Sequence, residues 1–208
     1  MSMSIIETRR LILRPWREED AAELYRYASD PEVGPAAGWA PHTSVEDSLQ
    51  VLRRILMKPD TWAVTLRPSD EPVGSVGVFP SSCSQASGQP EIGYWIARPL
   101  WGMGCIPEAV RALIELCFDR GAAEVWCAHA DFNLKSRRVI EKCGFRYRCA
   151  EDWTSPLGDV RKSLYYSIRR EAWQQAVGTS TARPQSGNAE EKSGRPMVVP
   201  TNGSEQQP

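Results

Sequence analysis

The chain has 208 residues, 41% of them hydrophobic and 25% charged, with a formal net charge of -1 at pH 7. This length suits one domain with a substantial core, and the small net charge excludes the strongly basic field that usually accompanies nucleic-acid binding. No run reaches the roughly 18 apolar residues of a membrane span, and charges interrupt the N-terminus before any long apolar run. We therefore expect a cytoplasmic protein without a membrane or nucleic-acid partner.

The first half of the chain contains strand and helix patterns in turn. Residues 10–16 (RLILRPW) predict a strand, and residues 17–30 have helical spacing of their apolar side chains. Residues 44–58 predict a second helix that starts with Ser44 as a capping residue. Residues 61–80 predict two strands around the turn PSDEP, and residues 90–97 predict a further strand.

The second half alternates helices with strands. A helix is expected to start near Ile106, directly after the sequence WGMG. Residues 123–130 predict a strand, residues 136–143 a helix and residues 163–168 a last strand. A run of strands followed by alternating helices and strands indicates an α/β (α+β mixed) fold, in which helices pack on a mixed sheet.

The composition changes near residue 175. Residues 175–208 are rich in Gly, Ser, Thr, Pro, Gln and Glu, without a periodic apolar pattern. Such a segment cannot bury enough apolar surface to offset its chain entropy. We expect one domain over residues 1–174 and a disordered C-terminal tail over residues 175–208.

The six cysteines show no metal-binding pattern along the sequence. None forms a CxxC pair, and no group of Cys and His has zinc spacing. Most lie in apolar runs, so we expect reduced, mostly buried thiols and no metal, rather than disulfides or metal ligands.

Two glycines stand between the strand at residues 90–97 and the following helix. A turn with Gly102 and Gly104 at a helix start exposes backbone N–H groups, which together with the helix dipole favour a phosphate or pyrophosphate. A tight turn that merely needs flexible residues is the alternative. The segment is neither a Rossmann G-x-G-x-x-G nor a Walker loop.

The motifs GYW, WGMG, NLKS and EKCGF occur in this order between residues 91 and 148. This segment resembles the core of the GNAT superfamily of N-acetyltransferases, and most resembles the ribosomal-protein N-terminal (RimJ/RimL-like) branch. Residues 6–33 resemble the start of that branch, and the resemblance covers roughly residues 5–173. It implies a GNAT-like, mostly antiparallel twisted sheet, splayed at the cofactor site and with helices on both faces.

The resemblance also implies a binding site for acetyl-CoA. The family pattern Gln/Arg-x-x-Gly-x-Gly/Ala falls on residues 101–106, with Trp101 and Ile106 as departures from it. Backbone amides in this turn would hold the pyrophosphate. The implied cofactor-binding residues are Trp95 and Ile96 through their main chain, Trp101, Gly102, Met103, Gly104, Cys105 and Ile106 at the phosphates, and Asn133 and Ser136 near the pantetheine arm. Capping of the next helix is the simpler role of Asn133 and Ser136, and it is compatible with cofactor contact.

Acetyl transfer to an amine requires a group that accepts the amine proton. The resemblance points to Glu91, although a solvated glutamate at a strand end is the alternative. His129 is a second candidate base, and a structural histidine is the simpler interpretation. In some relatives a tyrosine in the helix after the asparagine protonates the leaving thiolate, but the corresponding helix here contains no tyrosine. The resemblance therefore implies that Ser136 assists the leaving thiolate instead.

The acceptor side is least defined. The resemblance places residues 31–44 at the acceptor pocket, where Trp39 and His42 would bind the substrate or simply pack within the loop. We expect an acetyl-CoA-dependent N-acetyltransferase that attacks directly in a ternary complex, acts on a protein N-terminus or a small-molecule amine, and is a monomer or homodimer. The alternatives are a non-catalytic acyl-CoA-binding sensor on the same fold and an unrelated nucleotide-binding protein.

Overall fold

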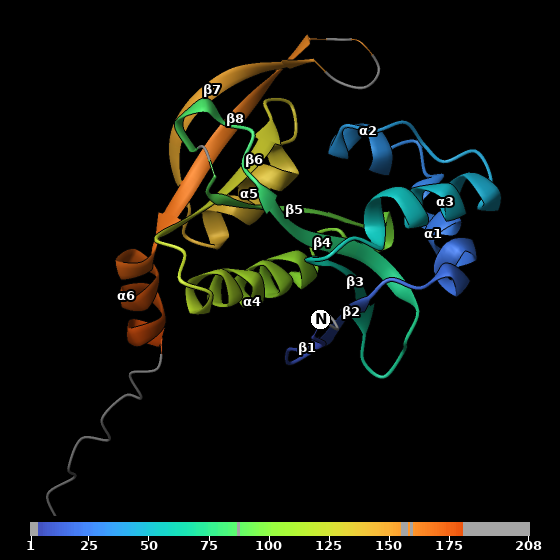
Figure 1. The fold of residues 1–208 in the computed structure, drawn as a ribbon, viewed down its shortest axis with the longest axis horizontal. Helices are drawn as coiled ribbons and strands as arrows, with labels where there is room; N and C mark the ends of the chain where they lie inside the picture. Colours follow the sequence, from blue (N-terminus) through green and yellow to red (C-terminus); the bar gives the residue numbers. More distant parts are fainter. Residues whose placement is uncertain (1–3, 87, 155–157, 159, 181–208) are drawn as a thin grey trace, which may run out of the picture.

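The computed structural model describes residues 4–86, 88–154, 158 and 160–180. Within these ranges eight strands form one sheet, in the order β1-β2-β3-β4-β5-β6-β8-β7 (Figure 1). The strands are β1 (Ile6–Glu7), β2 (Leu11–Pro15), β3 (Thr61–Leu66), β4 (Pro72–Pro80), β5 (Pro90–Ile96), β6 (Glu124–Ala130), β7 (Arg146–Thr154) and β8 (Val160–Arg169).

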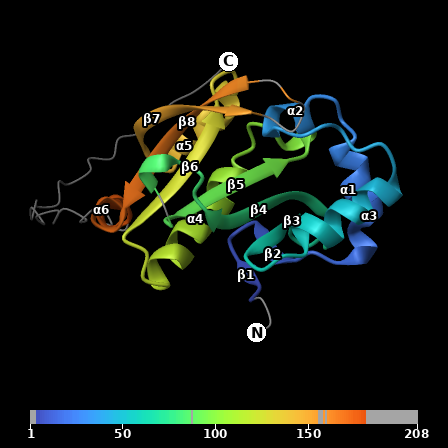
Figure 2. The ribbon, with the colours of Figure 1, turned by 45° about the horizontal axis from the view of Figure 1, so that its top comes forward.

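Helices cover both faces of this sheet, as Figure 2 shows. They are α1 (Ala21–Ala28), α2 (Val33–Ala37), α3 (Val45–Val51), α4 (Cys105–Asp119), α5 (Leu134–Lys142) and α6 (Arg170–Ser180). On β3, Trp62 and Val64 pack into the main core together with α4, whereas Ala63 packs with α1 on the other face. None of the described helices has both the length and the apolar character that crossing a bilayer requires.

The sheet opens between β5 and β6. These two strands are the one parallel pair among the described strands, and their register consists of Glu91 opposite Trp126 and Ile92 opposite Cys127. Beyond Ile92, β5 continues to Ile96 paired with β4, and β6 continues to Ala130 paired with β8. The predicted mixed fold with a mostly antiparallel, splayed sheet is therefore confirmed.

Most predicted elements are present, and the exceptions have identifiable causes. The sequence analysis missed β7, whose side chains are largely exposed and whose strand state depends on pairing with β8. It also assigned α2 to a loop, because α2 has five residues and contains Gly34 and Pro35. Helix α6 continues to Ser180, past the predicted start of the tail at residue 175. The rest of that tail, residues 181–208, lies outside the described residues.

Candidate active site

The turn before α4 adopts a backbone conformation that requires glycine. Gly102 has φ of 80° and Gly104 has φ of 77°, both in the left-handed region. Gly104 is the N-cap residue of α4, so the first N–H groups of that helix have no partner within it. Ile106 is 4% exposed and its side chain lies in the main core. At this departure from the family pattern, the side chain therefore packs into the core.

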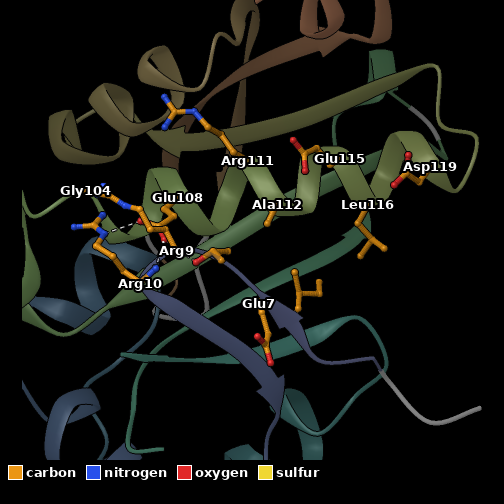
Figure 3. Close-up of a pocket in the computed structure, with 12 residues that line it drawn as sticks. Glu7, Arg9, Arg10, Gly104, Glu108, Arg111, Ala112, Glu115, Leu116 and Asp119 are labelled. Carbon is orange, nitrogen blue, oxygen red and sulfur yellow. Dashed lines mark hydrogen bonds and ion pairs between the residues drawn. The ribbon is translucent and has the colours of Figure 1, made fainter. Parts of the chain in front are cut away.

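An arginine that the sequence analysis did not consider fastens this turn. Arg10 Nη1 donates to the carbonyl oxygen of Met103 at 2.9 Å, and Arg10 Nε pairs with Glu108 Oε2 at 2.7 Å. Figure 3 shows Arg10 and Glu108 beside Gly104, at one end of a groove of about 660 Å³ that runs along α4. Met103 itself is 56% exposed. Nothing local in the sequence connects Arg10 with a turn 93 residues away.

A second cation, Lys135, lies beside the residue that precedes the turn. The indole N–H of Trp101 donates to the Ile96 carbonyl oxygen at 3.0 Å, which anchors the ring at the end of β5. Lys135 Nζ stands 3.5 Å from the centroid of that ring. The positive charge of Lys135 is thereby held close to the glycine turn, from the first turn of α5. In the sequence, the position of Lys135 between Asn133 and Ser136 in the motif NLKS could have indicated that it belongs to this site.

Asn133 caps α5 and contacts α2. Its Oδ1 accepts from the backbone N–H of Ser136 at 3.0 Å, so the predicted capping is confirmed. Its Nδ2 donates to the carbonyl oxygen of Ala36 at 2.8 Å. Since α2 also contacts β5 and β6, this bond ties the segment at residues 31–44 to the open side of the sheet.

Glu91 is buried rather than solvated. The residue is 6% exposed, and its Oε2 accepts a hydrogen bond of 2.6 Å from Ser81 Oγ. Burial raises the pKa of its carboxyl group, against the opposing effect of hydrogen bonds from Ser81 and from the backbone of Ser82. A raised pKa makes the Glu91 carboxylate a stronger proton acceptor than a solvated glutamate. Glu91 stands in register with Trp126, one position before Ile92 and Cys127, the last pair before the strands separate.

His129 lies on the opposite face of the sheet from Glu91. Glu91 shares a face with Trp126, and side chains alternate along β6, so His129 projects to the other side. Both of its ring nitrogens are engaged: Nδ1 with the Ala130 carbonyl oxygen at 2.7 Å, and Nε2 with Tyr166 Oη at 3.2 Å. Burial lowers its pKa. The geometry favours the structural interpretation of this histidine.

Tyr94 and Ser136 meet on that opposite face. Tyr94 Oη lies 2.8 Å from Ser136 Oγ and 3.2 Å from the Ser136 carbonyl oxygen. The phenol is largely enclosed, and burial is the main cause that raises its pKa well above the ordinary value. The sequence analysis found no tyrosine in α5 and gave Tyr94 no role in the chemistry. The structure instead brings a tyrosine hydroxyl from β5 to the side chain of Ser136.

The predicted acceptor residues belong to an aromatic cluster on the Glu91 face. Trp95 lies four positions beyond Glu91 on the same side of β5, with ring centroids 6.5 Å from Trp16 and 6.0 Å from Trp39. Trp39 in turn lies 5.2 Å from His42. His42 Nδ1 is 2.8 Å from Ser48 Oγ, so the ring is anchored on α3, and burial lowers its pKa. The side chains of Trp39 and His42 are half-buried, so each packs against its neighbours and also remains partly exposed to solvent.

The family of the chain follows from a comparison with known domains. The Acetyltransferase (GNAT) domain family matches residues 10–146. The chain belongs to the GNAT acetyltransferase family. The predicted family and the predicted acyltransferase class are thus confirmed, and acetyl transfer to amines is the general reaction of this family.

Relatives of this GNAT acetyltransferase include bacterial proteins of similar size. The uncharacterized N-acetyltransferase p20 of Bacillus licheniformis is 34% identical over 121 residues, which cover 56% of this chain and 67% of that protein. YdaF of Bacillus subtilis, named as a candidate ribosomal N-acetyltransferase, is 36% identical over 92 residues, covering 43% of this chain and 50% of that protein. These relatives agree with the predicted branch.

Solved structures share the fold of this GNAT acetyltransferase at lower identity. A candidate acetyltransferase from T. thermophilus has a TM-score of 0.73 and 23% identity, covering 88% of this chain and 98% of that one. The aminoglycoside acetyltransferase AAC(6')-Ib, solved in complex with coenzyme A, has a TM-score of 0.61 and 23% identity, covering 80% of this chain and 99% of that one. At these identities the likeness shows the fold.

Proposed function

We propose that this protein is an acetyl-CoA-dependent N-acetyltransferase that transfers the acetyl group to a primary amine by direct attack in a ternary complex. The observation that carries the proposal is the opening between β5 and β6. The buried carboxyl Glu91 lies on one face at this opening, and the hydroxyl pair of Tyr94 and Ser136 lies on the other.

The residues around this opening fit acetyl-CoA as a co-substrate. The glycine turn at residues 102–104 and the start of α4 offer backbone N–H groups and a helix dipole for the pyrophosphate. Lys135 adds a positive charge from α5. Among the described strands, none pairs with β5 beyond Ile92 on its β6 side, so the peptide groups of this edge can pair with the amides of the pantetheine arm, as an added strand would. Trp95 and Ile96 are part of this edge.

In this mechanism, residues on opposite faces of the sheet deprotonate the amine and assist the leaving thiolate. Glu91 takes a proton from the acceptor nitrogen, directly or through a water molecule, as the new C–N bond forms. The C–S bond breaks, and the leaving thiolate receives a hydrogen bond or a proton from Ser136. When Tyr94 donates to Ser136 Oγ, the Ser136 hydroxyl hydrogen is free for this role. Alignment of the amine with the thioester supplies a further part of the rate.

A buried donor beside Glu91 supports the presence of a polar ligand at this point. Trp126, the register partner of Glu91, is 3% exposed, and its Nε1 has no hydrogen-bond partner among the described residues. Buried donors are normally satisfied by protein, water or ligand. The proposal assigns this N–H to the water molecule or acceptor group that Glu91 deprotonates, with Trp39 and His42 along the acceptor's entry.

The proposal is tested by calorimetric titration of the full-length chain with acetyl-CoA, and with ATP and NAD as controls. The full chain is required, because α6 continues to Ser180 and truncation at residue 175 would cut it. Selective binding of acetyl-CoA, followed by thiol release with an N-terminal peptide or a small amine, supports the proposal. Binding without turnover on any amine would favour the sensor function, and absence of binding would overturn the cofactor assignment.

A further inference from the structure

Three potential metal ligands from distant parts of the chain meet near the edge of the sheet. Cys83 lies in the loop between β4 and β5, whereas Cys149 and Glu151 lie on β7. The two sulfur atoms are 3.4 Å apart, and Cys83 Sγ is 3.5 Å from Glu151 Oε1. The three donor atoms all lie within 4.8 Å of one another. The sequence analysis saw no metal site because 66 residues separate the two cysteines.

These distances suit one tetrahedral ion. With metal–sulfur bonds of about 2.3 Å and a metal–oxygen bond of about 2.0 Å, tetrahedral angles place two sulfurs about 3.8 Å apart and a sulfur and an oxygen about 3.5 Å apart. The observed sulfur–oxygen distance matches, and the sulfurs need to separate by about 0.4 Å. A disulfide would instead require the sulfurs to approach to about 2.05 Å and would need an oxidant.

The surrounding groups support the donor atoms as ligands. The backbone N–H of Ser84 donates to Glu151 Oε1 at 3.0 Å, and Ser84 Oγ also donates to that oxygen. The backbone N–H of Gln85 also donates a hydrogen bond to the Cys83 sulfur. Such outer hydrogen bonds orient ligands and are typical of metal sites in proteins.

As ligands, two thiolates and a carboxylate require a cation to balance their charge. Cys83 is 2% exposed, so bulk water gives its thiolate little stabilisation. A divalent cation among the three donors would supply the positive charge that these groups need in order to ionise together.

The geometry points to a zinc-binding site formed by Cys83, Cys149 and Glu151. Two thiolates and one carboxylate select Zn²⁺ over Mg²⁺ or Ca²⁺, which prefer oxygen ligands alone. Binding forms two Zn–S bonds and one Zn–O bond, and the two thiol protons pass to the solvent. Three protein ligands leave the fourth coordination position to a solvent molecule.

The ion would fasten the loop that holds Glu91. Ser81 Oγ accepts a hydrogen bond of 3.2 Å from the backbone N–H of Cys83 and donates to Glu91. Zinc would join this loop to β7, a strand whose described pairing is with β8 alone. The site is independent of the proposed acetyl transfer, and its primary test measures metal binding rather than activity.

The test is a titration of the reduced, metal-free full-length protein with Co²⁺ and then Zn²⁺. We expect one equivalent of Co²⁺ to give a thiolate-to-metal charge-transfer band, and Zn²⁺ to displace it. Cys83→Ser, Cys149→Ser and Glu151→Gln should each weaken binding by at least about 100-fold, since loss of a ligand costs no less than loss of an outer-shell group. Cys117→Ala, which changes a buried cysteine on α4, should bind as the parent does.

Glu151→Gln distinguishes the loss of a metal ligand from misfolding, because a glutamine oxygen can still accept the hydrogen bonds of Ser84. Zinc should also raise the melting temperature of the parent and of Cys117→Ala, and leave that of Cys149→Ser unchanged. Absence of binding by the reduced parent would overturn the proposal. So would equal affinity in the ligand variants, or the finding that mild oxidation joins Cys83 to Cys149 while the reduced pair takes up no metal.

Discussion

Tyr94 on β5 and Ser136 on α5 place their hydroxyl oxygens 2.8 Å apart, bridging the two sides of the opening between β5 and β6. Tyr94 lies two positions beyond Ile92, the last residue of β5 that pairs with β6. Ser136 lies in the first turn of α5, the helix that follows β6. The bond therefore joins two elements on either side of the opening. It also orients the Ser136 hydroxyl, which the proposed mechanism uses at the leaving group.

A double-mutant cycle should show that these hydroxyls act together. Tyr94→Phe and Ser136→Ala should each lower kcat with little change in acetyl-CoA affinity, because each removes part of one hydrogen-bonded unit. The double variant should lose less than the sum of the two single losses, with a coupling of about 0.5–3 kcal/mol. Steady-state kinetics and acetyl-CoA titrations measure both quantities. Strictly additive losses would mean that Tyr94 does not act through Ser136.

Glu91→Gln should lower kcat by about 10²- to 10⁴-fold while acetyl-CoA affinity stays close to that of the parent. In the parent, the rate should rise with pH as the Glu91 carboxyl loses its proton, and burial should place this limb above the usual range for a glutamate. The variant should lack the limb. A pH–rate profile of Glu91→Gln that parallels the parent profile would exclude Glu91 as the base.

Glu91→Gln should lower kcat but raise the stability of the folded protein at neutral pH. Burial raises the pKa of Glu91, so the folded state binds this proton more tightly than the unfolded state does. The stability contributed by the protonated carboxyl is fully present below the unfolded pKa and is lost as the pH rises through the raised folded-state pKa. Glu91→Gln should therefore unfold at a higher temperature than the parent at neutral pH, and the gap should narrow towards pH of about 4. A gap that is constant across this range would contradict a buried, ionising Glu91.

Two glycines that flank α4 allow a matched test of the turn at residues 102–104. Gly104 and Gly121 both have positive φ, of 77° and 92°, at opposite ends of the helix. Alanine at either position should cost about 1–2 kcal/mol of stability through backbone strain. Gly104→Ala alone should also weaken acetyl-CoA binding by about tenfold or more, because it moves N–H groups that face the phosphates. Calorimetry on both variants decides the point, and equal affinities would remove the turn from the binding site.

Lys135 and Lys142 form a second matched pair, at the two ends of α5. Both side chains are exposed, and Lys135 is the one held over Trp101. Lys135→Ala should weaken acetyl-CoA binding by about three- to tenfold, and this difference should shrink at high salt. Lys142→Ala should leave affinity unchanged. If the two variants bind alike at low salt, Lys135 makes no phosphate contact.

Much of the fold was predictable because its determinants are local. The apolar spacing of α4 and the capping of α3 by Ser44 are set by neighbours within one or two turns, and the structure confirms both. The order of motifs between residues 91 and 148 was sufficient for the family. In contrast, β7 could not be predicted, because its strand state depends on pairing with β8 rather than on an apolar pattern of its own.

The sequence by itself determined which residues can take part in the site, since residue type sets what each side chain can donate, accept or ionise. It did not determine which of them meet. Tyr94 and Ser136 are 42 residues apart, Arg10 and Met103 are 93 apart, and Cys83 and Cys149 are 66 apart. Whether Glu91 is solvated or buried was likewise decided by the loop that carries Ser81. Only tertiary packing brings such distant segments within hydrogen-bond distance and removes them from water, and these two effects set the geometry and the pKa values that the proposed chemistry requires.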